Sequence, residues 1–340
     1  MKAYYLVRHG AADKAFELRD LPELTPKVGE VLIQSEAFGL NFADVMARMG
    51  LYQDAPPLPA VLGYETVGRI TALGAGVTHL QVGQRVVALT RFGGYAQAAI
   101  ADARAAMPIP EDMDAAVATA LATQYATAWY AAEEAVRIHE GDHVLIHAAA
   151  GGVGVALTQI AKRRGAILFG TAGSDEKLKF LKEQGVDYPI NYRKVDFAQE
   201  IKRLGFDKKL DVVYDPIGGN SFKKGFKLLN AGGRLVGYGA STMTEAKGNP
   251  FKMLGVAKGF GIWSPIELLT NSKSLLGVNM LRIADNKPEI LGRCIKAVVE
   301  LTEAGVLNPI VGKTFPHTEL AQAHEYLASR QSVGKVAVLW

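Results

Sequence analysis

Residues 143–177 carry the clearest pattern of apolar and polar positions in the chain. Val144 to Ala150 is apolar without alternation, which is typical of a strand buried on both faces of a parallel sheet. After Gly151-Gly152-Val153-Gly154, apolar residues recur at helical spacing as far as Gly165, and a second apolar run covers 166–171. The pattern predicts the βαβ unit whose helix N-terminus binds a dinucleotide pyrophosphate.

The glycine turn has two interpretations. Glycine-rich turns between a strand and a helix also occur as plain packing devices, and Ala148 stands where the strict three-glycine motif has its first glycine. The strand–turn–helix context favours a bound dinucleotide. The cofactor-binding residues that we expect on this turn are Ala150, Gly151, Gly152, Val153 and Gly154.

The end of the second predicted strand indicates which dinucleotide is bound. NAD sites usually have an Asp or Glu there that holds the ribose 2′-hydroxyl. Here the corner begins Gly173-Ser174, and no acid ends the strand. Ser174 and Lys177 instead offer a hydroxyl and an ammonium to a 2′-phosphate, which favours NADPH. The alternative is that Asp175, Glu176 and Lys177 form only a solvated first helical turn.

The rest of the chain shows two patterns of predicted secondary structure. Residues 1–123 contain short apolar runs separated by glycines, which predicts a strongly bent β-rich domain with one helix at Asn41–Met49. Residues 124–281 alternate strands and helices, as in a doubly wound parallel sheet, with an excursion at 241–272 that lacks a clear period. Residues 282–340 return to the β-rich pattern of residues 1–123. We therefore expect an α/β chain in which the doubly wound domain is inserted into a discontinuous, partly barrel-like β domain.

Composition excludes several classes of function. The chain has 340 residues, 49% of them hydrophobic, and a net charge of +4 spread among interspersed charges, which argues against a nucleic-acid partner. The single Cys294 rules out internal disulfides, and Met1 to Tyr5 lacks the apolar core of a signal peptide. No stretch has the long apolar pattern of an integral membrane segment. These features predict a cytoplasmic protein.

Several motifs together resemble one known family. They are Asn41-Phe42-Ala43-Asp44, Gly50-Leu51-Tyr52, Gly63-Tyr64-Glu65, His147 to Gly154, Ile190-Asn191-Tyr192 and Asp215-Pro216-Ile217-Gly218-Gly219. The chain resembles, nearly end to end, the zinc-free NADPH:quinone oxidoreductases of the medium-chain dehydrogenase/reductase superfamily. In its sequence motifs the chain looks most like the vesicle amine transport protein branch of that family. The resemblance implies a Rossmann cofactor domain inserted in a GroES-like catalytic domain, and a homodimer.

The resemblance also implies roles for individual residues. NADPH would lie in a cleft between the domains, with Asn41, Asp44 and Tyr52 at its nicotinamide end as the catalytic residues and Thr127 on the carboxamide. Lys177, Tyr192 and Arg330 would meet the 2′-phosphate. Gly239, Ser241 and Asn279 lie where later loops of the family close over the cofactor. Asp44 has a second possible role, as a helix cap or a solvated surface residue.

A zinc site is not expected. Zinc members of the superfamily place a Cys in the segment that reads 39–42 here and a His where this chain has Tyr64, which leaves Glu65 alone of the usual ligand set. We interpret Glu65 as structural and His147 as a packed core residue.

Without a metal, the acceptor must already be electrophilic, which favours a quinone or an α,β-unsaturated carbonyl. Two alternatives remain: a low-turnover NADPH-binding protein that acts through partners, and a zinc-free alcohol or aldehyde dehydrogenase.

Overall fold

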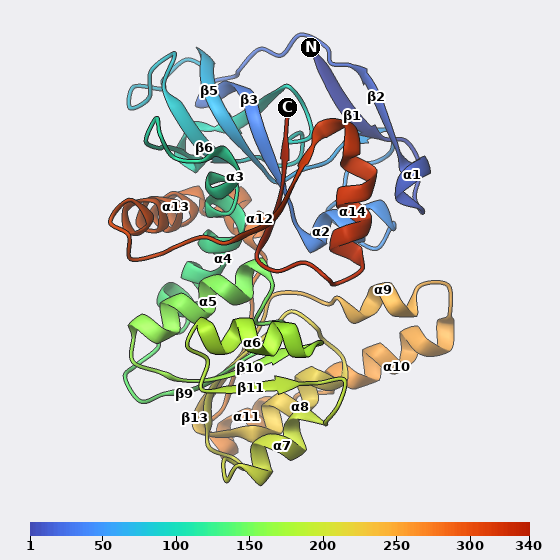
Figure 1. The fold of residues 1–340 in the computed structure, drawn as a ribbon, viewed down its shortest axis with the longest axis vertical. Coiled ribbons are helices and arrows are strands. Elements are labelled where there is room, and N and C mark those ends of the chain that lie inside the picture. Colours follow the sequence, from blue (N-terminus) through green and yellow to red (C-terminus); the bar gives the residue numbers. More distant parts are fainter. The chain divides into compact units, whose positions relative to one another are not determined.

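The computed structural model describes residues 1–340 and divides them into two compact units (Figure 1). The first unit contains Met1–Thr127 and Met280–Trp340, and the second contains Ala128–Asn279. The second unit is thus an insertion in the first. The predicted boundaries, 123/124 and 281/282, differ from these by a few residues. The first boundary falls within a helical run and not in a linker, because Leu121–Tyr125, Ala126–Trp129 (α4) and Tyr130–Ala135 are consecutive helical segments.

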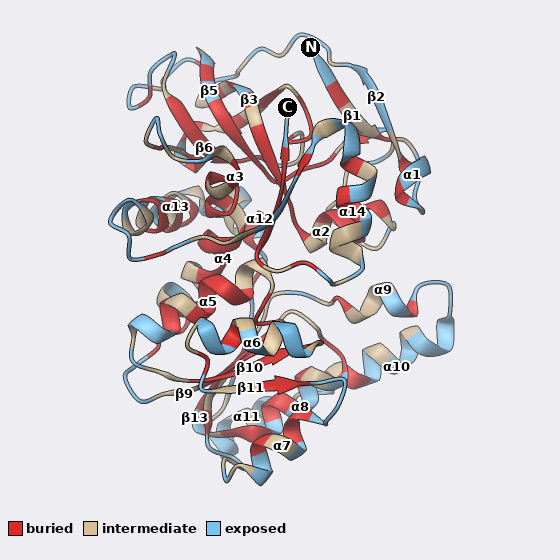
Figure 2. Cartoon of the chain, in the orientation of Figure 1, coloured by how far each residue is buried: buried red, intermediate tan, exposed pale blue.

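The second unit is built on a six-stranded sheet in the order β11-β10-β9-β12-β13-β14. All five pairings are parallel, so the predicted doubly wound class is confirmed. The strands are β9 (His143–Ile146), β10 (Ile167–Ala172), β11 (Tyr188–Asn191), β12 (Leu210–Asp215), β13 (Leu229–Gly237) and β14 (Ser274–Gly277). The central strands β9 and β12 bury Val144, Leu145 and Ile146 and Leu210, Val212 and Val213, as expected for a sheet covered on both faces (Figure 2).

Helices cover both faces of this parallel sheet. In Figure 1, α5 (Gly152–Arg163) and α6 (Asp175–Glu183) lie on one face, and α7 (Phe197–Arg203) and α8 (Asn220–Leu228) lie on the other. The excursion at 241–272 forms three further helices that the pattern did not reveal. They are α9 (Thr242–Ala246), α10 (Pro250–Phe260) and α11 (Pro265–Asn271).

The first unit contains two sheets. A seven-stranded mixed sheet follows the order β15-β16-β3-β5-β6-β8, with β7 also paired to β3, and a separate three-stranded sheet follows β2-β1-β4. Neither sheet closes into a complete barrel. The strands are β1 (Lys2–Leu6), β2 (Phe16–Asp20), β3 (Glu30–Leu40), β4 (Ala60–Val61), β5 (Glu65–Leu73), β6 (Arg85–Leu89), β7 (Ala98–Asp102), β8 (Ala106–Pro108), β15 (Val311–Pro316) and β16 (Lys335–Leu339).

Residues from the end of the chain complete the first unit. β16 pairs antiparallel with β3, with Ala337 opposite Gly39, so the predicted return of the C-terminal segment to the first β domain is observed. The helices of this unit are α1 (Ala12–Ala15), α2 (Phe42–Arg48), α3 (Ala115–Ala118), α12 (Met280–Asn286), α13 (Pro288–Glu303) and α14 (Leu320–Ala328), with short 3₁₀ turns at Ala103–Ala105 and His317–Glu319.

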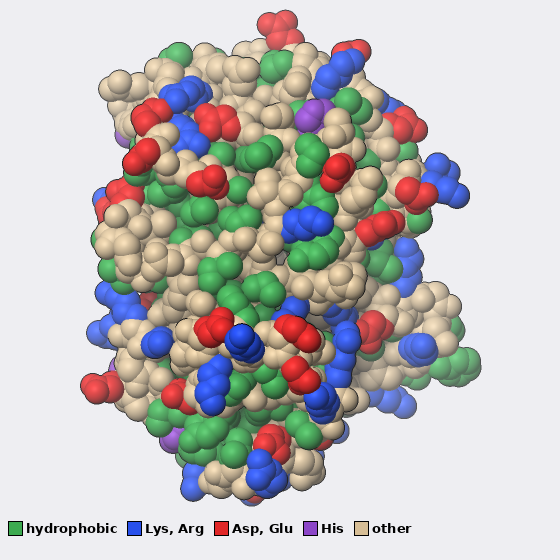
Figure 3. All heavy atoms as spheres, in the orientation of Figure 1, with side chains coloured by type: hydrophobic (Ala, Val, Ile, Leu, Met, Phe, Trp, Pro, Cys, Tyr) green, Lys and Arg blue, Asp and Glu red, His purple; other side chains and the backbone are tan.

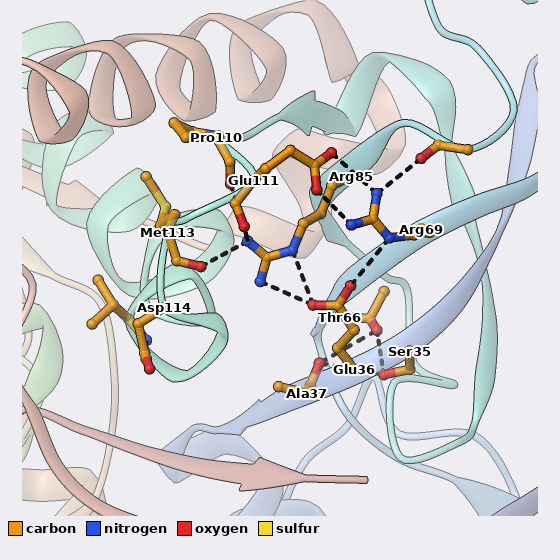
Figure 4. A network of polar contacts seen from close by, with 12 residues as sticks. Ser35, Glu36, Ala37, Thr66, Arg69, Arg85, Pro110, Glu111, Met113 and Asp114 are labelled. Carbon is orange, nitrogen blue, oxygen red and sulfur yellow. Dashed lines mark hydrogen bonds and ion pairs between the residues drawn. The ribbon is translucent and has the colours of Figure 1, made fainter.

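A buried arginine joins the strands of the mixed sheet to the loop after β8 (Figure 4). Arg85 is only 6% exposed, and its Nε donates to Glu36 at 3.0 Å. Its guanidinium also donates to the carbonyls of Pro110, Glu111 and Met113 at 3.0, 3.2 and 2.7 Å. The guanidinium of Arg85 is therefore satisfied by Glu36 and three backbone carbonyls within the unit, and we assign Arg85 a structural role.

No helix in this chain is both long and apolar enough to cross a bilayer. On the face drawn in Figure 3, Lys and Arg side chains alternate with Asp and Glu and do not form a single basic stripe. Several of the large exposed apolar side chains lie on α10, on α11 and in the turn between them, where Phe251, Leu254, Ile262, Ile266 and Leu269 are between 54% and 99% exposed.

Candidate functional site

The glycine turn lies at the carboxyl end of β9. Ala148 adopts a φ of 50°, in the left-handed region, although a glycine would take this conformation at less cost. A β-carbon on Gly154 would lie 2.7 Å from Cα of Ala149 and would overlap the carbonyl of Ala148. Gly154 is therefore required by the close approach of α5 to the strand, while Gly151 and Gly152 lead into the first turn of α5.

The N-terminus of α5 fits an anionic group. No side chain caps it, and its first turn contains no acidic residue, so its backbone N–H groups carry the uncompensated positive end of the helix dipole. The loop after β13 approaches the loop after β12 closely, because a β-carbon on Gly239 would lie 2.8 Å from the carbonyl oxygen of Pro216. The backbone N–H of Ser241 donates to the same carbonyl at 3.1 Å.

A second group of residues gathers after β10 and β11. A β-carbon at Gly173 would lie 2.8 Å from the Tyr192 hydroxyl and 3.3 Å from Nε of Arg193. Lys177 is half-buried, and its pKa is lowered by burial and then by the neighbouring positive charge of Arg193. Ser174 accepts a hydrogen bond from the Lys177 backbone amide at 3.3 Å and so caps α6. Two cations and a phenol thus share one corner.

One acidic residue of this corner, Asp175, is engaged by other residues. Asp175 pairs with Lys194 at 2.5 Å and accepts from the Asn191 amide at 3.0 Å. Both contacts lower its pKa and keep it ionised. Because Asp175 is paired with Lys194 while Lys177, Arg193 and the Tyr192 hydroxyl gather, the corner fits a phosphate better than it fits a ribose diol.

In the first unit, Asn41 and Asp44 lie at the start of α2. Asp44 is fully buried, and its Oδ2 accepts the Asn41 backbone N–H at 2.8 Å while its Oδ1 accepts from Gly63 at 3.3 Å. Burial and, to a smaller extent, the negative charge of Glu65 raise the pKa of Asp44 to about 8, although the Asn41 backbone hydrogen bond and Lys335 act to lower it. The capping role considered for Asp44 is therefore present, but inside the protein and not on a solvated surface.

The Asn41 side chain belongs to a buried polar network. Its Nδ2 donates to both oxygens of Glu65, at 3.0 and 2.8 Å, and its Oδ1 accepts from Nζ of Lys335 at 3.2 Å. Lys335 also pairs with Glu65 at 2.5 Å, and Thr123 donates its hydroxyl to Glu65. Glu65 is thus bonded within its unit.

Tyr52 lies near this network. Its ring meets that of Tyr64 edge-on, with centroids 6.1 Å apart. Burial raises the pKa of Tyr52, as does Asp54, so the phenol is neutral near pH 7 and can donate a hydrogen bond. Burial also raises the pKa of Tyr64.

The remaining candidates are Thr127, Ser241, Asn279 and Arg330. Thr127 is buried, and its hydroxyl donates to the Thr123 carbonyl at 2.6 Å. Asn279 is exposed just after β14, and Ser241 is buried after β13. Arg330 follows α14 with a φ of 60° and belongs to the first unit, whereas Lys177 and Tyr192 belong to the second.

The residues at the position that holds zinc in the zinc members of the superfamily do not fit a metal. Nowhere in the chain do three or more His, Cys, Asp or Glu side chains gather as a metal site would require. Glu65, which remains from the ligand set of zinc relatives, faces a lysine ammonium. His147 is buried, its Nδ1 lies 3.0 Å from the Thr171 hydroxyl, and its ring packs edge-on against Phe197. Burial lowers the pKa of His147.

Sequence reasoning missed two residues of these groups. Arg193 follows Tyr192 directly and could have been found as a second cation at the same corner. Lys335 lies 270 positions from Glu65, and the only signal was a lysine at the start of the apolar run Val336-Ala337-Val338.

The architecture and the glycine turn define a class of protein. A doubly wound parallel sheet that carries an uncapped helix N-terminus at its carboxyl edge is a dinucleotide-binding unit, here inserted in an open β unit.

Comparisons with known proteins identify the family. A family model described as alcohol dehydrogenase GroES-like domain matches residues 27–111, and one described as zinc-binding dehydrogenase matches 152–291. The synaptic vesicle membrane protein VAT-1 homolog of Rattus norvegicus is 33% identical over 343 residues, which covers 100% of this chain and 84% of that protein. A 2-haloacrylate reductase of a Burkholderia species is 32% identical over 93% of this chain and 92% of its own length.

A solved structure agrees over the whole chain. The quinone oxidoreductase of Escherichia coli, complexed with NADPH, superposes with a TM-score of 0.85 at 28% identity and covers 100% of both chains. The present chain therefore belongs to the medium-chain dehydrogenase/reductase superfamily, together with the quinone oxidoreductases and the VAT-1 homologues.

Proposed function

We propose that the protein is an NADPH-dependent reductase of quinones or α,β-unsaturated carbonyls. The observation that carries the proposal is the corner at Gly173, where Lys177, Tyr192 and Arg193 gather and Asp175 pairs with Lys194. The superposed quinone oxidoreductase is described as an NADPH complex, and the Burkholderia relative is named a 2-haloacrylate reductase. Both descriptions support the proposal.

Each group of residues has a role in cofactor binding under this proposal. Ala150, Gly151, Gly152, Val153 and Gly154 present the N-terminus of α5 to the pyrophosphate. Lys177, Tyr192 and Arg193 hold the 2′-phosphate, with Ser174 fixing the first turn of α6. Thr127, Gly239, Ser241, Asn279 and Arg330 are proposed as further cofactor contacts, as in the family.

The acceptor is reduced with little acid assistance. When bound, NADPH supplies the hydride. Asn41 and Tyr52 are the proposed donors to the acceptor oxygen, and Asp44 holds the Asn41 backbone in place. A neutral phenol and an amide are weak acids, so they suit acceptors whose products are already stabilised anions, such as a phenolate or an enolate, better than acceptors that form a basic alkoxide.

Steady-state oxidation of NADPH tests the proposal with three acceptor classes: a simple quinone, an enone, and an unactivated aldehyde. We expect the first two to be turned over faster, and we expect the rate to survive exhaustive chelation. Asn41→Ala and Tyr52→Phe should lower kcat without abolishing NADPH binding. Faster turnover of aldehydes or alcohols, or activity that a chelator removes and zinc restores, would contradict the proposal. Tight NADPH binding without turnover would favour the low-turnover binding protein.

We also propose that two copies of the chain associate through the second unit. β14 is the last strand of the parallel sheet, so one of its edges has no strand partner within the chain. Such an edge is a hazard unless another chain or element covers it. The exposed apolar side chains of α10 and α11 belong to the same unit, and pairing about a twofold axis is the commonest mode of assembly.

A further inference from the structure

The first unit contains a completely buried ion pair that the proposed reaction does not yet use. Lys335, at the start of β16, and Glu65, at the start of β5, both have side chains with 0% exposure, and their charged atoms lie 2.5 Å apart. Burying two charges costs solvation free energy that only good geometry and further hydrogen bonds recover. Because stability alone does not explain such a pair, a functional role is expected.

The backbone of β3 makes room for this pair. A β-carbon on Gly39 would overlap both Cε of Lys335 and Oε1 of Glu65. Gly39 pairs with Ala337 across the β3–β16 ladder, which brings β16 against this position. Glycine is thus needed here for space and not for an unusual backbone conformation.

The pair dictates the orientation of the Asn41 amide. An ammonium only donates hydrogen bonds and a carboxylate only accepts them. Lys335 therefore attracts Oδ1 of Asn41, at 3.2 Å, and Glu65 attracts Nδ2, at 2.8 and 3.0 Å. Rotating the amide by 180° would set its NH₂ against the ammonium and its oxygen against the carboxylate. One amide orientation is strongly favoured.

We propose that Lys335 is a positioning residue: together with Glu65, it locks the Asn41 side-chain amide in the single orientation that the acceptor meets. This inference rests on the proposed function, because it assigns Asn41 to the acceptor. This role of Lys335 differs from stabilisation of the fold, because it acts on the orientation of the Asn41 side-chain amide.

A double-variant experiment separates positioning from stability. Lys335→Met should lower kcat by about ten- to hundredfold, the effect typical of a misplaced group, while the Kd for NADPH stays within about twofold. Asn41→Ala should cost a similar factor in the wild-type protein but almost nothing further in Lys335→Met. Tyr52→Phe should cost the same factor in both backgrounds. Lys296→Met, which removes an exposed lysine of α13, is the matched control and should leave kcat unchanged.

A second measurement does not depend on turnover or on an uncompensated charge. In Glu65→Gln/Lys335→Met, no buried charge is left alone, so the fold should survive. The side-chain amide NMR signals of Asn41, assigned by their loss in Asn41→Ala, should be sharp in the wild type and shifted or broadened in this double variant. Independent, multiplicative losses for Lys335→Met and Asn41→Ala would overturn the inference, as would unchanged Asn41 amide signals. If the wild type reduces no acceptor, the proposed function fails, and the amide signals alone decide the role of Lys335.

Discussion

The Tyr192 hydroxyl lies 2.8 Å from the position that a β-carbon would occupy at Gly173. Gly173→Ala should therefore push the phenol away from the proposed 2′-phosphate site. Loss of one hydrogen bond to a charged group costs about 1.5–3 kcal/mol, so NADPH affinity should fall by at least tenfold while NADH affinity changes little. Fluorescence titration with both cofactors measures the two dissociation constants.

The control for this change is Gly255→Ala in α10, where a β-carbon would meet nothing within 4 Å. It should leave both dissociation constants unchanged. An equal loss for NADH and NADPH in Gly173→Ala would mean that Tyr192 does not distinguish the two cofactors.

The lowered pKa of Lys177 predicts how cofactor preference depends on pH. Burial and then Arg193 disfavour its ammonium, whereas a bound 2′-phosphate would restore the charged form and raise the pKa. NADPH binding should therefore be coupled to proton uptake, and NADPH affinity relative to NADH should fall as the pH rises towards the ordinary lysine value of 10.5. Titrations from pH 7 to pH 10 with the wild type and Lys177→Ala test this. Lys177→Ala should prefer NADPH over NADH only weakly, and this preference should not depend on pH. The same pH dependence in Lys177→Ala as in the wild type would contradict the assignment of Lys177 to the 2′-phosphate.

The unpaired edge of β14 predicts a dimer that one substitution weakens. Leu276→Lys places a charge on the proposed interface and should cost about 2 kcal/mol of association free energy, the size typical of a central interface residue. Sedimentation at micromolar concentration measures it. Leu18→Lys, on the outer strand of the three-stranded sheet and 45% exposed, is the matched control. A wild-type protein that sediments as a monomer would refute the dimer.

The βαβ unit could be predicted because its signals are local. The apolar run before Gly151, the helical spacing after it and Gly165 at the helix end lie within 30 residues of one another, and each can be recognised from neighbouring residues alone. The predicted strand was nevertheless too long, since the chain already turns at Ala148, in the left-handed region. Apolar residues continue past the strand because the turn is buried too.

The other features depend on contacts that sequence spacing does not reveal. The helices of the excursion were missed because Phe251, Leu254 and Ile262 are exposed, so apolar residues there do not mark one inward face. The Lys335–Glu65 pair was missed because a lysine before a strand is normally solvated. Only the ladder between β16 and β3 brings it inside.

The buried carboxyl of Asp44 predicts an unusual dependence of stability on pH. Burial raises its pKa from 3.8 to about 8, so the folded protein holds a proton that the unfolded chain releases between these values. The stabilisation from this proton is complete below pH 3.8 and is lost as the pH rises through about 8. Asp44→Asn keeps the site neutral at every pH. The unfolding free energy of the wild type minus that of the variant should therefore fall by about 1.4 kcal/mol per pH unit between pH 5 and 7.5.

Urea unfolding at several pH values measures this difference. Asp20→Asn is the control, because contact with Lys2 lowers the pKa of that exposed carboxyl and makes its dependence run the other way. A difference that stays flat or rises with pH for Asp44→Asn would show that Asp44 is ionised in the folded protein. Asp44 would then add a second negative charge beside Glu65, and the single ammonium of Lys335 would have to balance both. The orientation of Asn41 would in that case depend on a network with excess negative charge, and Glu65→Gln/Lys335→Met would leave the Asp44 carboxylate buried without a counter-charge, so the double variant would itself be strongly destabilised.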